Sequence, residues 1–133
     1  MKIAIIGGVQ STEIVIKNLY THNFKDVYIW GYKPENTKFV SGWRDLELVA
    51  KKFKYKYKNF IKINNIEEEL LKINPDIIFA VGISQIIPVS IITIPRLGCI
   101  GFHPTILPKG RGRAPVPWLI LENSKGASTF FLI

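Results

Sequence analysis

The sequence has 133 residues, of which 18 are Lys or Arg and 10 are Asp or Glu, so its formal net charge at pH 7 is +8. With 47% apolar residues, a chain of this length is expected to fold as one domain, and a disordered tail is excluded. A single cysteine, Cys99, excludes an internal disulfide framework and an all-cysteine zinc site, and we predict no metal site. No apolar run reaches the ~18 residues that a membrane span needs, so we expect a cytoplasmic protein.

Apolar runs and helical patterns alternate along the first part of the chain. Residues 3–6 form a continuous apolar run typical of a strand that is covered on both faces, and residues 27–30 form a second. Between them, Ser11 is a candidate N-cap of a helix. Ser41 is a candidate cap of the next helix, which the apolar spacing carries to Phe53.

The lysine-rich segment 51–62 has two interpretations. Over 53–58, lysine and aromatic residues alternate with the period of a strand, which predicts a half-buried edge strand whose lysines discourage pairing with other chains. Lysines with interleaved aromatic residues are also typical of a groove that binds nucleic acid. We favour the edge strand, so nucleic acid is not an expected partner.

The second part of the chain continues the alternation. In order, we expect a helix from Asn65, a strand over 77–81, a short helix from about Pro88, a strand over 99–102, a loop over 103–114, a helix over 115–121 and a strand over 128–133. Strands separated by helices predict right-handed βαβ units, and therefore an α/β fold with a Rossmann-like, open, mostly parallel sheet flanked by helices. Because the chain ends on a strand-forming run, we interpret it as truncated at the C-terminal end.

In an open parallel sheet, ligands bind beyond the carboxyl ends of the strands, so four loops are candidates: 7–11, 31–41, 82–88 and 103–114. In the first, Gly8 and Ser11 stand where backbone N–H groups at a helix N-terminus can hold an anion. This loop has neither the dinucleotide nor the P-loop fingerprint. A glycine turn that packs a strand tightly against a helix explains it equally well.

The segment 101–118, GFHPTILPKGRGRAPVPW, has the strongest chemical pattern. His103 follows a strand directly, and the proline after it favours extended backbone. Histidine is the side chain that changes charge nearest neutral pH, so it suits accepting a proton from an attacking amine. Lys109, Arg111 and Arg113 follow in a glycine-bearing stretch, where guanidinium groups suit phosphate or carboxylate. Taken singly, these residues favour a structural histidine and a solvated loop over a functional site.

In this order the residues resemble the N-terminal catalytic domain of the formyltetrahydrofolate-dependent formyltransferases. That family includes methionyl-tRNA formyltransferase, glycinamide ribonucleotide formyltransferase and the sugar N-formyltransferases. Its signature is Asn-x-His, then Pro or Gly, a small hydroxyl residue, Leu-Leu-Pro, a basic stretch and Arg-Gly, and residues 103–108 and 111–115 match that order. The segments 1–8, 75–88 and 124–133 are similar to other family segments. The resemblance thus covers 1–133 as a single, incomplete formyltransferase-like catalytic domain.

The resemblance implies transfer of a formyl group from formyltetrahydrofolate, the co-substrate, to an amine. It assigns proton handling and stabilisation of the tetrahedral intermediate to His103. It also implies a folate pocket lined by Gly82, Ile83, Ser84, Gln85, Ile86 and Pro88. A phosphate-bearing substrate would lie against Arg113, and we add four further candidates for its binding: Gly8, Ser11, Lys109 and Arg111.

The acceptor implied most closely is a nucleotide-linked amino-sugar, because GRGRAP followed by PW most resembles the sugar branch of the family. The net positive charge suits any phosphate-rich acceptor. Two alternatives stay open: a methionyl-tRNA formyltransferase-like protein, and a non-catalytic remnant that binds folate or a nucleotide-sugar.

Two departures from the family pattern bear on activity. Gly101 stands at the position of the family's Asn, and the loss of one donor to a developing oxyanion costs ~2.7–4 kcal/mol. The family's catalytic Asp would lie beyond Ile133, where the chain ends. The sequence therefore predicts weak or no turnover by this chain on its own.

Overall fold

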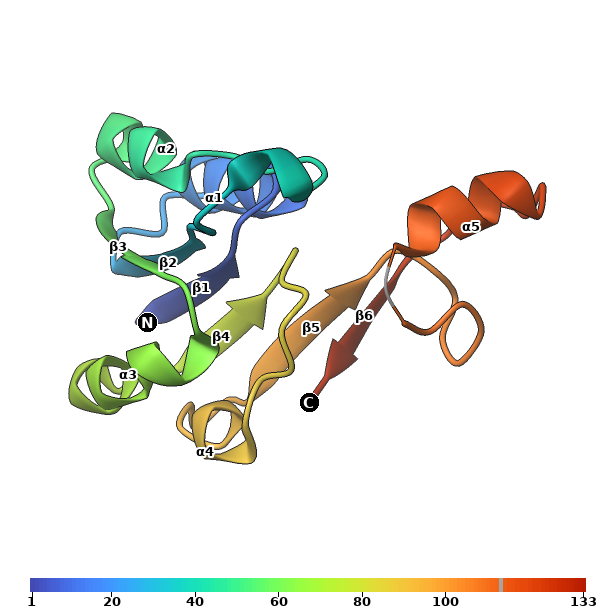
Figure 1. The fold of residues 1–133 in the computed structure, drawn as a ribbon. Helices are drawn as coiled ribbons and strands as arrows, with labels where there is room; N and C mark the ends of the chain where they lie inside the picture. The colour runs from blue at the N-terminus through green and yellow to red at the C-terminus, as the bar shows by residue number, and fades with distance from the viewer. Residues whose placement is uncertain (113) are drawn as a thin grey trace.

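A computed structural model describes residues 1–112 and 114–133, which form a six-stranded sheet with helices on both faces (Figure 1). The strands are β1 (Ile3–Gly7), β2 (Val27–Tyr32), β3 (Lys56–Phe60), β4 (Ile77–Ala80), β5 (Cys99–His103) and β6 (Thr129–Leu132). The helices are α1 (Gln10–Thr21), α2 (Leu46–Phe53), α3 (Glu67–Ile73), α4 (Val89–Ile92) and α5 (Pro115–Leu121), with 3₁₀ turns η1 (Thr37–Phe39) and η2 (Ile63–Ile66).

The strand order is β3-β2-β1-β4-β5-β6, with β1 to β5 parallel and β6 antiparallel to β5. The predicted open, mostly parallel α/β sheet is therefore confirmed. Because β1 pairs with both β2 and β4, the winding direction reverses between β1 and β4. The carboxyl ends of these two strands form the topological switch point, where sheets of this kind bind ligands.

Two hydrophobic clusters hold the sheet, one on each face. Strand β1 contributes to both because its side chains alternate between the faces and all are buried. On the α3 and α4 side, the buried cluster includes Ala4, Ile6, Ile78, Ile91 and Cys99. On the α1 and α2 side, it includes Ile3, Ile5, Ile16, Ile29 and Leu46.

The predicted N-caps of the first two helices are wrong, although both helices form. Helix α1 begins one residue before Ser11, with Val9 in the capping position. Helix α2 is capped by Asp45, whose carboxylate accepts a hydrogen bond from the N–H of Glu47 at 3.0 Å. Asp45 is the better cap because it lies directly before the apolar stripe, whereas Ser41 lies in an exposed turn four residues earlier.

The edge-strand interpretation of the lysine-rich segment is confirmed. Helix α2 ends at Phe53, Lys54 adopts left-handed backbone (φ 57°), and β3 then runs along the edge of the sheet. Its lysines are engaged within the protein: Lys58 pairs with Glu69, and Lys56 Nζ lies 2.6 Å from the hydroxyl of Tyr28.

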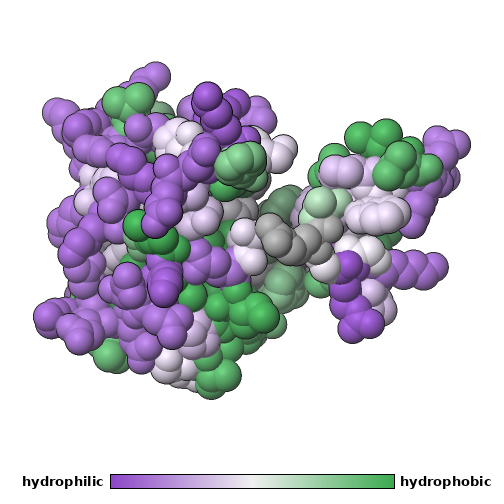
Figure 2. All heavy atoms as spheres, viewed as in Figure 1, coloured by the Kyte–Doolittle hydropathy of each residue, from purple (hydrophilic) through white to green (hydrophobic). Residues whose placement is uncertain are grey.

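The other edge of the sheet is less covered. Strand β6 returns antiparallel to β5, and α5 lies beyond it, away from the other helices (Figure 1). Hydrophobic residues lie exposed over α5 in Figure 2. Within the described residues, no helix has both the length and the apolar character needed to cross a membrane.

Candidate active site at the carboxyl ends of the strands

Thr12 joins the two loops of the switch point. Its side chain is fully buried, and its Oγ1 donates to the carbonyl of Val81 at 2.6 Å. The same oxygen accepts from the N–H groups of Gly8 at 3.1 Å and Val9 at 3.3 Å. The loop after β1 is thereby fixed to the end of β4. Sequence reasoning missed this residue, since one threonine in a helical first turn has no distinguishing pattern.

The glycines at this junction are required by close approach. A Cβ on Gly7 would lie 2.0 Å from the carbonyl oxygen of Val81. Gly82 has φ +71°, and a Cβ there would lie 2.2 Å from Cγ2 of Val9. The tight-packing explanation of the glycine turn therefore has direct support.

Two backbone N–H groups of the loop that was predicted to bind an anion, near Gly8 and Ser11, already donate within the protein. The N–H of Gly8 already donates to Thr12, and the N–H of Gln10 donates to the carbonyl of Gly42 at 3.0 Å. An anion would have to compete with these acceptors or use the half-buried Ser11. The role of both residues in substrate binding stays a prediction.

The segment 82–88 follows β4 without regular secondary structure, with bends at Gly82 and Gln85, and leads to α4. The side chain of Gln85 anchors it, accepting from the N–H of Ile63 at 2.8 Å and donating to the carbonyl of Ile61 at 2.7 Å. Ile83 and Ile87 pack against the core, whereas Ser84 is exposed and the exposed fraction of Ile86 is 92%. Pro88 caps α4.

The main chain of this segment has free hydrogen-bonding capacity. Among the backbone hydrogen bonds of the described residues outside helices and strands, none involves the N–H or carbonyl groups of residues 83–87. Gln85 is thus a structural anchor, and the backbone on either side of it offers donors and acceptors to a ligand.

His103 is the last residue of β5, at the predicted strand tip. Its Nε2 lies 2.8 Å from the carbonyl oxygen of Gly110. Since a carbonyl can only accept, Nε2 carries the proton in this bond, and Nδ1 of the neutral ring is an acceptor. The ring is half-buried and held by its own loop rather than packed in the core.

Two threonines hold the loop that carries His103. Thr105 is 3% exposed, and its Oγ1 donates to the carbonyl of Lys109 at 2.9 Å. The hydroxyl of Thr129, on β6, donates to the carbonyl of Thr105 at 2.7 Å and accepts from the N–H of Leu107 at 3.2 Å. Strand β6 therefore supports the loop. Lys109 and Arg111 are exposed on it, and Arg113 lies outside the described residues.

Gly101 faces an aromatic ring. In the β5–β6 ladder it pairs with Phe131, and a Cβ on Gly101 would lie 2.5 Å from Cζ of that ring. Residues 101 and 103 share one face of β5, so Phe131 lies beside the histidine's position on the strand. The absence of a side chain at Gly101 is therefore part of the strand packing.

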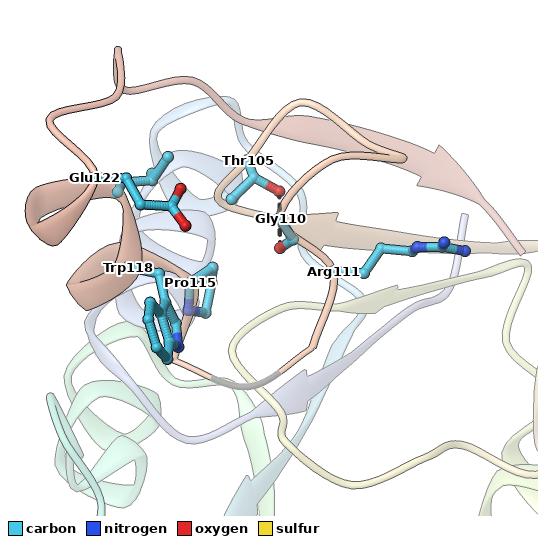
Figure 3. A pocket seen from close by; sticks show the side chains of 7 residues that line it. Thr105, Gly110, Arg111, Pro115, Trp118 and Glu122 are labelled. Carbon is cyan, nitrogen blue, oxygen red and sulfur yellow. Dashed lines mark hydrogen bonds between the residues drawn. The ribbon is translucent and has the colours of Figure 1, made fainter.

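A cavity of about 270 Å³ lies between this loop and α5. Thr105, Gly110 and Arg111 line it from the loop, and four residues line it from the helix: Pro115, Trp118, Leu119 and Glu122. In Figure 3, the carboxylate of Glu122 points toward Thr105, the indole of Trp118 lies beside Pro115, and Arg111 extends away from both. Sequence reasoning missed Trp118 and Glu122, although their i,i+4 spacing places both on one helix face.

Cys99 and possible metal ligands are the remaining reactive groups to consider near this loop. Burial raises the pKa of the Cys99 thiol to about 11, so it is a packed core residue and not a thiolate nucleophile. Over 1–112 and 114–133, no group of three or more His, Cys, Asp or Glu side chains is arranged to hold a metal ion.

Comparison with known proteins decides the family. The family model described as formyl transferase matches residues 1–132. The chain belongs to the formyl transferase family. The resemblance inferred from the His103 loop is thereby confirmed, and so is the fold that it implied.

Individual relatives match part of this formyl transferase chain. A methionyl-tRNA formyltransferase of Clostridioides difficile (strain 630) is 42% identical over 67 residues, which is 49% of this chain and 22% of that protein. One from Malacoplasma penetrans (strain HF-2) is 44% identical over 64 residues, 48% of this chain and 20% of that protein. The matched segments thus span about a fifth of these curated relatives.

Solved structures share the fold. The phosphoribosylglycinamide formyltransferase of Bacillus halodurans has a TM-score of 0.76 at 13% identity, covering 100% of this chain and 72% of that one. A Mycobacterium tuberculosis protein described as a candidate sugar N-formyltransferase has a TM-score of 0.67 at 17% identity, covering 99% of this chain and 47% of that one. At such identities the likeness concerns the fold alone.

Proposed function

We propose that this protein transfers a formyl group, in the cytoplasm, from formyltetrahydrofolate to the amine of a phosphate-bearing acceptor, with His103 handling the proton. The observation that carries the proposal is a histidine at the tip of β5, held outside the core, in a chain of the formyl transferase family. The amine nitrogen attacks the formyl carbon, the bond from that carbon to the folate nitrogen breaks, and the folate nitrogen takes up a proton.

The segment 82–88 can serve as the binding site of formyltetrahydrofolate. The pterin ring of a folate carries donors and acceptors along one edge, and the main-chain groups of 83–87 are free to pair with such an edge. Ile83 and Ile87 pack against the core and hold the segment in place without using these groups. Formyltetrahydrofolate would therefore be held mainly by backbone, with Gln85 acting as an anchor for the loop.

His103 would receive the proton that the attacking amine loses. Gly110 fixes the ring through Nε2, so Nδ1 is the atom that accepts. A base at this position is in the right place relative to the donor, because the β4 and β5 ends are neighbours in the sheet. General base catalysis by such a residue contributes typically 10²–10⁴-fold.

For the acceptor, we propose a nucleotide-linked amino-sugar whose phosphates lie against the exposed Lys109 and Arg111. A second acceptor has specific support, since the relatives at 42% and 44% identity are named methionyl-tRNA formyltransferases. Formyl transfer assays with a nucleotide-linked amino-sugar and with methionyl-tRNA, run side by side, decide between them. Donor binding without transfer to either would identify the chain as a non-catalytic binding protein.

A proline substitution tests the donor site. Ile86→Pro removes one backbone N–H at a position whose side chain is 92% exposed, so core packing is unaffected. Ile86→Ala is the matched control, because it removes the same side chain and keeps the N–H. By isothermal titration with 5-formyltetrahydrofolate, we expect Ile86→Pro to weaken binding about tenfold, the equivalent of one hydrogen bond, and Ile86→Ala to leave it near wild type. Equal affinities for both variants would contradict backbone recognition.

A histidine substitution tests the base. His103→Ala should lower the rate of formyl transfer at least about 100-fold while the midpoint of urea unfolding stays close to wild type. The other histidine, His22, is exposed beyond the end of α1, and His22→Ala serves as the control. An unchanged rate in the His103 variant would remove it from the mechanism.

A further inference from the structure

We propose that the cavity between the His103 loop and α5 binds a single sugar ring of the acceptor, stacked on Trp118 and hydrogen-bonded to Glu122. The proposal rests on the proposed function and gives roles to Trp118, part of the PW that resembles the sugar branch, and to Glu122. It separates the acceptor into two parts: the ring in the cavity and its phosphates on Arg111.

The size of the cavity favours one ring. Its volume is about 270 Å³, which lies just below the ~300–1,000 Å³ of pockets that enclose drug-sized ligands. A whole nucleotide-sugar is larger than this space, whereas one pyranose ring fits it. The rest of such an acceptor would have to extend out of the cavity.

The lining supplies two complementary groups for a sugar. The indole of Trp118 is 59% exposed, and its electron-rich face suits the C–H face of a pyranose. The carboxylate of Glu122 is an acceptor only, so it suits hydroxyl groups, which donate. Glu122 points toward Thr105 and Trp118 lies beside Pro115 (Figure 3), and both line the cavity, so a ring in contact with both would lie between α5 and the His103 loop.

The position of Arg111 indicates how the sugar is oriented, with its phosphate at the Arg111 end of the cavity. This residue also lines the cavity, but its side chain extends away from Trp118 and Glu122 (Figure 3). A guanidinium at that end suits the phosphate next to the ring. Gly110 connects the cavity to the catalytic histidine, because its backbone lines the cavity while its carbonyl oxygen binds His103 Nε2. The cavity is therefore one residue away from His103, on the Nε2 side of its ring.

Saturation-transfer NMR on the 133-residue chain with UDP-glucosamine at millimolar concentration tests the placement directly. We expect the largest saturation on the ring protons of the sugar and less on those of the uracil. Trp118→Ala should weaken sugar binding about tenfold, as expected for the loss of an aromatic contact, and Trp118→Phe should retain part of it. Glu122→Gln should lower the affinity for UDP-glucosamine but not for UDP.

The matched control is Ile120→Ala, because Ile120 lies on the same helix and is 75% exposed, yet does not line the cavity. Titration of each variant with 5-formyltetrahydrofolate separates the two proposals. If the donor binds normally while the sugar protons receive no saturation, or Trp118→Ala and Ile120→Ala behave alike, the sugar site is wrong and the formyl transfer proposal stands. If saturation concentrates on the uracil, the cavity holds the base and the sugar assignment is also wrong. If the donor fails to bind as well, the proposed function itself fails.

Discussion

The two ends of the sheet are built differently. From β1 to β4, helices cover both faces, and residues such as Ile5 and Ile78 are fully buried. In β6 and α5, large apolar residues stay exposed: 62% for Phe130, 70% for Leu132 and 75% for Ile120. Because full burial of such a side chain contributes ~1.5–3 kcal/mol, most of the folding free energy resides in the first part.

The candidate chemistry lies mainly in the second, less buried part. His103, the basic loop and the cavity all belong to β5, β6 and α5, whereas the donor segment 82–88 follows the well-packed β4. A well-packed framework beside it allows the site to keep an irregular, glycine-bearing loop. Substitutions in the two parts should accordingly differ in kind.

The largest expected effect is on the buried framework. Ile5→Ala in β1 removes a fully buried side chain and should lower the free energy of unfolding by about 2–5 kcal/mol. Leu132→Ala in β6 removes a similar side chain that is 70% exposed, and the loss should stay within about 0.5 kcal/mol. Urea unfolding of both variants measures the contrast, and equal losses would refute the division of the sheet into two parts.

A smaller effect is expected where β5 meets β6. Gly101→Asn forces a side chain into the ring of Phe131 and should cost about 1–3 kcal/mol, as overpacked sites do. In a Phe131→Val background the same substitution should cost less, because the ring that blocks it is gone. Gly126→Asn, at a glycine with nothing within 4 Å of an added Cβ, is the control.

The packing of Phe131 also bears on whether replacing Gly101 by Asn could restore activity. Restoring the family's Asn at Gly101 cannot by itself restore an oxyanion donor while Phe131 occupies the space. A rate gain for formyl transfer is expected only in the double variant. If Gly101→Asn alone is as stable as wild type, the ring is free to move and the packing explanation is wrong.

The sequence was sufficient for the fold because each buried strand is a continuous apolar run. Residues 3–6 and 77–81 needed no tertiary information, and the helix over 115–121 was predicted with its observed bounds. The caps were predicted less well: Val9 and not Ser11 caps α1, and Asp45 and not Ser41 caps α2, because several residues before each helix can begin it.

The site could be predicted from the sequence only where neighbouring residues form a recognisable motif. His103 has a distinctive neighbourhood in the sequence, so its place at a strand tip could be predicted. The bonds of Thr12 to Val81 and of Thr129 to Thr105 join residues 69 and 24 positions apart, and such contacts leave no local pattern. The same holds for Phe131 opposite Gly101, which follows only from the register of the β5–β6 ladder.

The smallest expected effect concerns the bridge between the two parts of the sheet. Asp76, just before β4, accepts from the Nε of Arg96 at 2.7 Å and from the N–H of Lys2 at 2.7 Å. The Arg96 bond is the main cause that lowers the pKa of Asp76, and the Lys2 amide adds to it. Since the pKa in the folded state lies below that of the unfolded chain, this carboxylate stabilises the fold fully above the unfolded value of 3.8, and the contribution disappears as the pH falls through the folded value.

Asp76→Asn should therefore lower stability slightly at neutral pH and flatten the decline of stability below about pH 4. Thermal unfolding at a series of pH values measures both changes. Glu35→Gln, at an exposed position in the loop after β2, is the charge-matched control and should leave the acid decline as in wild type. If the acid decline is unchanged in the Asp76 variant, the bridge from β1 and β4 to the segment before β5 contributes nothing measurable. Strand β5, which carries His103, would then be held to the framework by its pairing with β4, the bond from the N–H of Leu97 to the carbonyl of Asp76 and the packing of Cys99.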